Sequence, residues 1–213
     1  RVDTDGRYAA VCDYKTGSPK LSLNEIMEGL SLQLITYLLA LSKTKSTKDL
    51  LPAAMMYIYL HGRPKSISVP PNGIPHAKEK ENTNGIFLND PDVLRTLDSQ
   101  SGTDDGFIGV SYVKDGSVKK TSPVLTAEEF EALKALTEKI LIRLYSRLES
   151  GEIAIHPVKN GTLSPCSYCP YRSICRFDPA LPENSFDYIS KVSDKTIREK
   201  LDEEMKRTGK ENL

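Results

Sequence analysis

The sequence predicts an α/β domain built around a small mixed sheet. Two strand-like runs, Tyr8–Tyr14 and Ala53–Leu60, flank a long amphipathic segment, and a second amphipathic segment follows at Thr126–Leu148. Strands that alternate with helices are typical of α/β domains. The chain has 213 residues, of which 38% are hydrophobic and 27% are charged, so it is long enough to bury one core.

The first element is a predicted β-hairpin. Arg1–Asp3 forms one strand and Tyr8–Tyr14 the other, and the turn Thr4–Arg7 contains an Asp-Gly pair. Asp-Gly between two strand-like runs is a strong hairpin signal.

A helix is predicted from Ser22 to Lys43. Ser22 can cap its start, and Glu25 three residues later completes a capping box. Apolar residues recur at steps of three and four along one face, which indicates an amphipathic helix: Leu23, Ile26, Met27, Leu30, Leu34, Tyr37, Leu38 and Leu41.

The middle of the chain alternates apolar runs with polar stretches. Ala53–Leu60 follows Pro52 and predicts a buried strand, whereas residues 62–86 are rich in Pro, Lys, Asn and Gly and predict a long loop. Asp90–Leu97 predicts a short helix with Pro91 at its first position. A second hairpin is expected from Phe107–Val113 and Ser117–Thr121 around Lys114-Asp115-Gly116.

The last third begins with the helix Thr126–Leu148, which Thr126 caps and whose first turn carries Glu128 and Glu129. A short extended segment is expected at Ile153–Pro157, and a highly charged, partly helical tail from Val192 onward. We expect residues 1–180 to form the main domain and residues 181–213 a charged C-terminal tail.

Composition narrows the classes of function. Lys plus Arg and Asp plus Glu both number 29, a net charge of zero, which counts modestly against a self-sufficient nucleic-acid binder. No apolar run approaches the roughly 18 residues that span a bilayer. We therefore expect no membrane partner, and we expect a cytoplasmic location. The chain starts at Arg1 rather than Met, inside a predicted strand, and we expect it to be a fragment.

Asp13-Tyr14-Lys15 ends the first apolar run and is the first candidate site. Side chains two residues apart on a strand point to the same face. A carboxylate that holds a divalent ion, next to a fixed cation, suits phosphodiester hydrolysis. An ordinary surface ion pair at a solvated strand end is the alternative reading of this tripeptide.

A second set of polar residues lies on the first predicted helix. Gly29, Gln33 and Tyr37 fall at steps of four and predict one row on that helix. Gly29 would allow a close approach, Gln33 offers a donor and an acceptor, and Tyr37 offers a ring and a hydroxyl. The alternative is that Tyr37 belongs to the core and Gln33 to its boundary.

Three of the four cysteines cluster near the end of the chain. Cys166, Cys169 and Cys175 follow a C-x2-C-x5-C spacing, whereas Cys12 stands alone beside Asp13 on the strand and should face the core. Three thiolates suit an iron–sulfur cluster or zinc, each with a fourth ligand. Chance spacing of free cysteines is the alternative.

Together these motifs resemble the RecB-like branch of the PD-(D/E)XK nucleases, in which the acid and Lys of a strand precede a helix bearing Q-x-x-x-Y. Within that branch the nuclease domains of the AddB family, from bacterial helicase–nucleases, are most similar. The resemblance covers most of the chain, more weakly in residues 62–125. It rests on Asp13–Gly17, Gly29–Leu38, Pro52–Tyr59, Ser150-Gly151 and Cys166–Asn184.

The resemblance implies a restriction-endonuclease-like fold, with a mixed sheet flanked by helices, a C-terminal iron–sulfur cysteine segment and a helical tail. It also implies roles for individual residues. Asp13 would be the second metal-binding acid, the Tyr14 carbonyl a further Mg²⁺ ligand and Lys15 the catalytic lysine. Gln33 and Tyr37 would support the site or the DNA.

In this family the first acid lies in a G-x-x-D segment directly before an Arg-Val-Asp such as Arg1-Val2-Asp3, which places it before Arg1. Asp3 and Asp5 are poor replacements, since Asp5 belongs to a turn and Asp3 to a strand end. One carboxylate holds Mg²⁺ weakly. We therefore expect the chain by itself to be inactive.

The same family joins Cys166, Cys169 and Cys175 to a distant upstream Cys to hold a [4Fe–4S] cluster. We expect the longer protein to carry this cluster, and a chain without that fourth Cys can lack it. A zinc site completed by His156 is the alternative. Otherwise His61, His76 and His156 are expected to be surface residues.

The implied function is Mg²⁺-dependent exonuclease cleavage of DNA, in a helicase–nuclease subunit that processes double-strand breaks for recombination repair. DNA and an AddA-type helicase–nuclease subunit, in a heterodimer, would be its partners. A stand-alone RecB-like exonuclease of the CRISPR-adaptation type is one alternative, which Ser150-Gly151 and the long tail disfavour. A DNA-end-binding module without catalysis is another.

Overall fold

A mixed five-stranded sheet forms the centre of the fold in the computed structural model, which describes residues 1–17, 19–60, 83–103 and 106–211. The strand order is β1-β2-β3-β4-β5. Neighbours pair antiparallel, parallel, antiparallel and parallel in turn, so the predicted mixed sheet is confirmed. The strands are β1 (Val2–Thr4), β2 (Tyr8–Lys15), β3 (Leu51–Tyr59), β4 (Thr83–Leu88) and β5 (Val124–Leu125).

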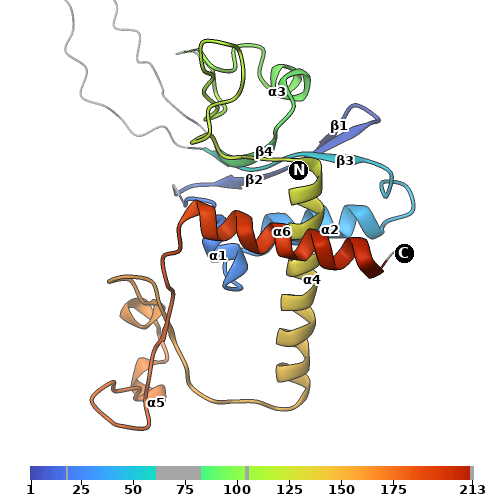
Figure 1. The fold of residues 1–213 in the computed structure, drawn as a ribbon. Coiled ribbons are helices and arrows are strands. Elements are labelled where there is room, and N and C mark those ends of the chain that lie inside the picture. Colours follow the sequence, from blue (N-terminus) through green and yellow to red (C-terminus); the bar gives the residue numbers. More distant parts are fainter. Residues whose placement is uncertain (18, 61–82, 104–105, 212–213) are drawn as a thin grey trace, which may run out of the picture.

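Helices lie on both sides of this sheet (Figure 1). One side holds α1 (Leu23–Met27), α2 (Gln33–Lys43), α4 (Ala127–Glu149) and α6 (Asp194–Glu211), and the other holds α3 (Pro91–Leu97). The core is apolar and tightly closed, because the largest fully buried side chains come from both the sheet and the helices: Phe87, Phe130, Ile26, Leu34, Ile35, Met55, Leu133 and Leu201.

The predicted first hairpin is confirmed. Val2 pairs with Val11 and Thr4 with Ala9 in the antiparallel register. In the turn, Asp5 Oδ1 accepts hydrogen bonds from the backbone N–H groups of Arg7 and Tyr8, and Gly6 takes a φ of 91°. The turn residues therefore fix the register that positions the end of β2.

The prediction of a single helix over Ser22–Lys43 is wrong, because the helix is interrupted between α1 and α2. Gly29 has φ 83° and Ser31 has φ 50°, in the left-handed region that a helix cannot contain. Ser22 does cap α1 by accepting from the Glu25 N–H. The Glu25 side chain does not complete the predicted capping box. Its carboxylate accepts hydrogen bonds from the side chains of Ser31 and Asn160 instead.

Two predictions for the middle of the chain need correction. Most of the loop predicted over 62–86 lies outside the described residues, but Thr83–Leu88 is strand β4 and Gly85 packs directly on Met56 of β3. The second predicted hairpin is reduced to one antiparallel bridge, Tyr112 to Val118. The Ala53–Leu60 strand is confirmed as β3.

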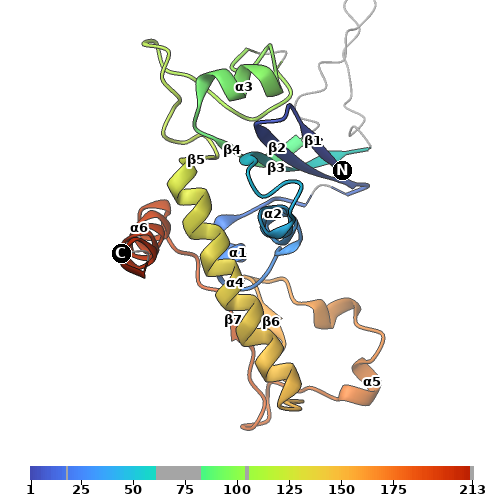
Figure 2. The ribbon, with the colours of Figure 1, turned by 90° about the vertical axis from the view of Figure 1, so that its right-hand side faces the viewer.

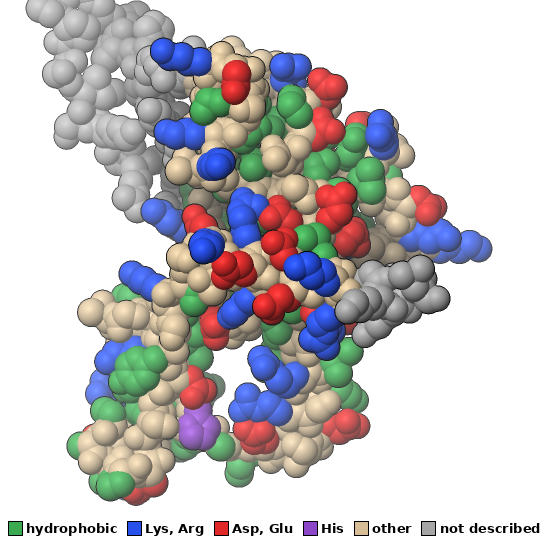
Figure 3. Space-filling view, in the orientation of Figure 1, with side chains coloured by type: hydrophobic (Ala, Val, Ile, Leu, Met, Phe, Trp, Pro, Cys, Tyr) green, Lys and Arg blue, Asp and Glu red, His purple; other side chains and the backbone are tan. Residues whose placement is uncertain are grey.

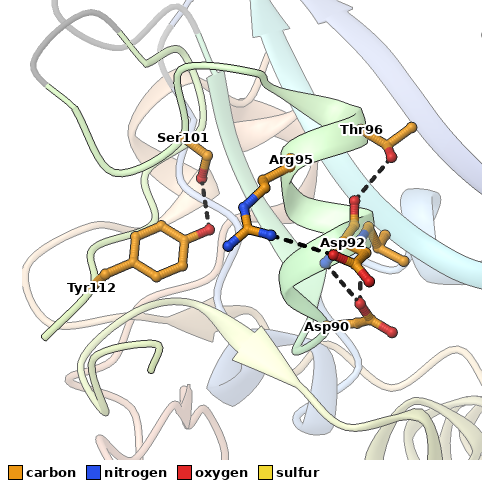
Figure 4. A network of polar contacts seen from close by, with 7 residues as sticks. Asp90, Asp92, Arg95, Thr96, Ser101 and Tyr112 are labelled. Carbon is orange, nitrogen blue, oxygen red and sulfur yellow. Dashed lines mark hydrogen bonds and ion pairs between the residues drawn. The ribbon is translucent and has the colours of Figure 1, made fainter. Parts of the chain in front are cut away.

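The short helix α3 begins as predicted. Asp90 Oδ1 accepts from the N–H groups of Asp92 and Val93, and Pro91 occupies the first turn. Figure 4 shows Arg95 reaching back to Asp92 on the same helix. Beside α3, the hydroxyls of Ser101 and Tyr112 lie 3.1 Å apart and join the two loops of this side of the sheet (Figure 4).

Helix α4 is the longest element and carries the predicted cap. Thr126 Oγ1 accepts from the Glu129 N–H, and the Glu129 carboxylate accepts from the Thr126 N–H, which forms a complete capping box. Figure 2 shows that the C-terminal half of α4 extends away from the sheet, beyond α1, α2 and α6.

Helix α6 packs across α4, with Ile197 and Leu201 buried. Buried Glu129 of α4 pairs with Arg198, and buried Glu204 pairs with Lys139 of α4. On the outer face, Lys and Arg side chains alternate with Asp and Glu side chains over this helix (Figure 3), which agrees with the zero net charge. No helix in the described parts of the chain is long and apolar enough to cross a membrane.

The cysteine segment, residues 157–190, projects from the sheet side that holds α1 (Figures 1 and 2). It contains β6 (Val158–Lys159), the 3-10 helix η1 (Pro165–Tyr168), α5 (Arg172–Cys175) and β7 (Asp187–Tyr188). Parallel pairing of β6 with β7 closes its base. The extended segment predicted at Ile153–Pro157 joins no sheet; pairing starts one residue later, at Val158.

Candidate functional site

Asp13 and Lys15 lie at the carboxyl end of β2 and point to the same face of the sheet. Lys15 Nζ is 2.6 Å from Asp13 Oδ2. The two side chains are 24% and 31% exposed, so the pair is shielded but reachable from solvent. The spacing of two residues along the strand therefore produces the pair that the sequence predicted.

Gln33, the first residue of α2, extends this pair into a chain of contacts. Lys15 Nζ donates to Gln33 Oε1 at 3.1 Å, and Gln33 Nε2 donates to the Tyr37 hydroxyl at 3.1 Å. The four residues Asp13, Lys15, Gln33 and Tyr37 are thus brought together. Gly29 lies in the break before α2, so the predicted row on the helix consists of Gln33 and Tyr37 alone.

Tyr57 lies beside the candidate site, and the sequence analysis did not single it out. It stands beside Asp13 in the parallel register of β2 and β3, and its ring centroid lies 5.2 Å from Lys15 Nζ. Such a distance allows a cation–π contact. Burial raises the pKa of Tyr57, and the nearby Lys15 ammonium partly offsets this. The strand was predicted, but nothing in the spacing showed which strand would lie beside β2.

The charge state of Lys15 follows from its contacts. The hydrogen bond to Asp13 raises the pKa of Lys15 above its usual value of 10.5. The side chain therefore remains an ammonium at neutral pH. It can neutralise negative charge on a bound group, but it cannot accept a proton as a general base.

The neighbouring acids do not add to this pair. Asp3 stands opposite Ala10, so it lies on the other face of β2 from Asp13, where Arg1 Nε binds it at 2.8 Å. Asp5 serves the hairpin turn. Neither residue therefore lies where it could replace the first metal-binding acid, which agrees with the expectation from the sequence.

Tyr14 can offer only its backbone carbonyl to the candidate metal site beside Asp13. Its side chain points away from Asp13, and its hydroxyl accepts a hydrogen bond from Arg1 Nη1 at 3.0 Å. The carboxylate of Asp13 and a backbone carbonyl are both hard oxygen donors, which Mg²⁺ prefers, so the donor types fit that ion. Across residues 1–17, 19–60, 83–103 and 106–211, no three His, Cys, Asp or Glu side chains gather into a group that could hold a metal.

The cysteines are divided as their spacing suggested. Cys12 is 2% exposed, and burial raises the pKa of its thiol, which makes it an unsuitable thiolate ligand. Cys166 and Cys169 are partly exposed and Cys175 is exposed. These three have the right chemistry for a cluster, but the described structure does not bring them, or His156, into one ligand group.

Comparison with known proteins identifies a family and several relatives. Residues 1–176 match the family model of the PD-(D/E)XK nuclease superfamily. Three similar proteins are each described as one subunit of an ATP-dependent helicase/deoxyribonuclease. The protein of Clostridium kluyveri is 34% identical over 92% of this chain, that of Desulforamulus reducens 32% over 89%, and that of Alkaliphilus oremlandii 28% over 95%.

These relatives are much longer than the chain. The matched region is 18% of the Clostridium kluyveri protein, 17% of the Desulforamulus reducens protein and 18% of the Alkaliphilus oremlandii protein. The similarity therefore concerns one portion of each relative.

Proposed function

The chain belongs to the PD-(D/E)XK nuclease superfamily, and on that premise we propose that it is the DNA-cleaving domain of a helicase–nuclease subunit. Its role there would be exonuclease processing of DNA double-strand breaks for recombination repair. The support comes from the relatives described as helicase/deoxyribonuclease subunits, which match 89–95% of the chain.

The observation that carries the proposal is the continuous set of contacts from Asp13 through Lys15 and Gln33 to Tyr37. An isolated surface ion pair would not need a hydrogen bond from its ammonium to a third residue, as Lys15 makes to Gln33. Here a strand end and a helix start, 18 residues apart, hold one ammonium beside one carboxylate. This arrangement presents a fixed positive charge next to a hard oxygen donor.

Asp13 and the Tyr14 carbonyl would hold Mg²⁺, which supplies Lewis-acid chemistry at a phosphodiester when it is bound. Lys15 would stabilise the negative charge that develops on the phosphate oxygens during attack by water. Gln33 keeps the Lys15 ammonium in place through its Oε1 atom. Tyr37 is 45% exposed, so its ring and hydroxyl are available to a DNA strand.

Cys166, Cys169 and Cys175 would form part of the ligand set of a [4Fe–4S] cluster, with a fourth Cys from another part of the longer protein. Their C-x2-C-x5-C spacing and their exposure support this. Within the described residues these three side chains do not form one ligand group, so the cluster would be completed only by the fourth Cys. Metal analysis after oxygen-free purification distinguishes iron from stoichiometric zinc, the alternative occupant.

DNA and an AddA-type helicase–nuclease subunit would be the partners, within a cytoplasmic heterodimer. The balanced surface charge supports delivery of the DNA by a larger assembly, because the described surface has no basic excess of its own.

The test places Asp13→Asn and Lys15→Met in the longer protein that carries this domain and measures Mg²⁺-dependent degradation of linear DNA by the assembled complex. Each variant should lower the rate by about a hundredfold or more, since each removes a group that acts on transition-state charge. Asp92→Asn, on exposed α3, is the matched control and should leave the rate unchanged.

Wild-type rates for both site variants would refute the proposed site. DNA-end binding without cleavage, unaffected by either variant, would favour the non-catalytic module instead.

A further inference from the structure

Glu25 lies outside the contacts that touch Lys15, but it occupies the junction between three parts of the molecule. It belongs to α1, it faces the break before α2, and it contacts the base of the cysteine segment. Both of its carboxylate oxygens are engaged: Oε2 accepts from Ser31 Oγ at 2.9 Å and Oε1 accepts from Asn160 Nδ2 at 3.0 Å.

The contact with Ser31 fixes an unusual backbone. Ser31 has φ 50°, which non-glycine residues adopt only when their surroundings hold them there. Glu25 holds this turn twice, because its backbone carbonyl also accepts from the Leu30 N–H at 2.8 Å. Among the α1 residues, Ile26 also holds the turn, through its carbonyl and the Gly29 N–H, but Glu25 is the one whose side chain binds Ser31.

This turn determines where α2 begins. Leu32 caps α2 without a side-chain hydrogen bond, so no cap of its own fixes the helix start. Gln33 follows directly and accepts from Lys15 Nζ. A displacement of the turn would therefore move Gln33 away from the ammonium.

The contact with Asn160 connects the same turn to the cysteine segment. Asn160 pairs through its backbone with Leu163, three residues before Cys166. At the other end of the segment, Asn24 Nδ2 donates to the Ser190 carbonyl at 2.9 Å. Adjacent residues of α1 thus hold both ends of the segment, and the Glu25 side chain also binds Ser31 in the turn before Gln33.

We propose that Glu25 is a positioning residue that couples the cysteine segment to the Lys15 site through Asn160, Ser31 and Gln33. The proposal rests on the proposed nuclease function only in calling Lys15 catalytic. The coupling itself concerns hydrogen bonds that can be measured without cleavage. It assigns the cysteine segment a physical route to the site that does not depend on what the cysteines bind.

The experiment uses the chain Arg1–Leu213 and an exchanged pair. Asn160→Asp places a second carboxylate against Glu25, which breaks the contact and loosens the turn. Adding Glu25→Gln restores it in reverse, because the new amide can donate to Asp at position 160 while its carbonyl still accepts from Ser31. Amide hydrogen exchange at Leu30 and Thr36 reports on the turn and the first turn of α2, since their N–H groups bond to Glu25 and Leu32.

Asn160→Asp should speed exchange at both amides by about tenfold and shift the NMR signal of the Gln33 side-chain amide. The double variant should return both measurements to wild type. Asn24→Ala, the matched control, should speed exchange at Asp187 and Ile189 of the segment's base without affecting Leu30, Thr36 or Gln33.

Unchanged signals at Leu30, Thr36 and Gln33 in Asn160→Asp would overturn the coupling, and so would failure of the double variant to restore them. Changes of equal size at Leu30, Thr36 and Gln33 in Asn24→Ala would also overturn the coupling. A restored signal, together with wild-type DNA cleavage by the assembled complex when its longer protein carries Asp13→Asn or Lys15→Met, would instead refute the proposed function and leave the coupling in place.

Discussion

Lys15 and Asp13 form an ion pair in which Nζ lies 2.6 Å from Oδ2, and Gln33 holds the ammonium on its other side. A carboxylate and an amide oxygen together leave the ammonium little freedom to turn. The Lys15 ammonium is therefore a fixed positive charge at the carboxyl end of β2.

Asp13→Asn should lower the pKa of Lys15 toward its usual value of 10.5, since the hydrogen bond to Asp13 is the main cause of the raised pKa. A raised pKa in the folded state contributes stability that is complete below about pH 10.4 and is lost as the pH rises through the folded pKa. The wild type should thus exceed Asp13→Asn in stability by a constant amount from pH 7 to about pH 9, and by less above about pH 10.4. NMR titration of the Lys15 side chain checks this, and a wild-type pKa at or below 10.5 would contradict it.

One added residue should strengthen binding of Mg²⁺. The β1–β2 register pairs Arg1 with Cys12 through two backbone hydrogen bonds, so a residue joined before Arg1 would stand opposite Asp13 on the same face. An aspartate there gives the ion a second carboxylate. Titration with Mg²⁺ should show binding tighter by about tenfold or more, equivalent to about 1.4 kcal/mol. An added asparagine is the control, and equal affinity for both extensions would refute the expected geometry.

Gly85→Ala should destabilise the sheet. A Cβ at this position would lie 2.5 Å from Met56 Cβ and 2.7 Å from the Met55 carbonyl oxygen, so β3 and β4 would have to separate. The expected loss is about 1 to 3 kcal/mol in the free energy of unfolding, measured by chemical denaturation. Gly109→Ala is the control, because a Cβ there meets nothing within 4 Å. Equal stabilities would show that the strands adjust without cost.

Asp98→Ala should destabilise the side of the sheet that carries α3. The buried Asp98 carboxylate accepts from the N–H groups of Phe107 at 2.7 Å, Ile108 at 3.2 Å and Gln100 at 3.0 Å. Removing the acceptor leaves the buried Ile108 N–H and two partly buried N–H groups without this partner, which should cost about 2 to 4 kcal/mol in thermal or chemical denaturation. Asp92→Ala, whose side chain is 94% exposed, should cost less than about 1 kcal/mol. Similar losses for the two variants would contradict the role of Asp98.

Local signals in the sequence predicted most of the fold. Thr126 with Glu129 and Asp90 with Pro91 marked the starts of α4 and α3, and Asp5-Gly6 marked the first hairpin. The break between α1 and α2 was missed because the apolar periodicity continues through it. Only the left-handed backbone of Gly29 and Ser31, held by Glu25, interrupts the helix.

The contacts of the candidate site were predictable where they depend on spacing along one element and not where they depend on which strands pair. Two-residue spacing on a strand and four-residue spacing on a helix correctly indicated Asp13 with Lys15 and Gln33 with Tyr37. Tyr57 enters the site through the parallel pairing of β2 with β3, a contact across 44 residues that no local pattern encodes. The same is true of Asn160, which reaches Glu25 from 135 residues away.

The packing of α6 on α4 has a consequence for the integrity of the molecule. The cysteine segment exposes large side chains such as Tyr168, Ile174 and Tyr188. Many proteases cut the backbone next to residues of this kind. A cut there would divide the chain into two pieces, yet buried Ile197 and Leu201 and the Arg198–Glu129 pair would keep the last helix bound. The nicked protein should migrate as one particle in native conditions and as two bands only after denaturation.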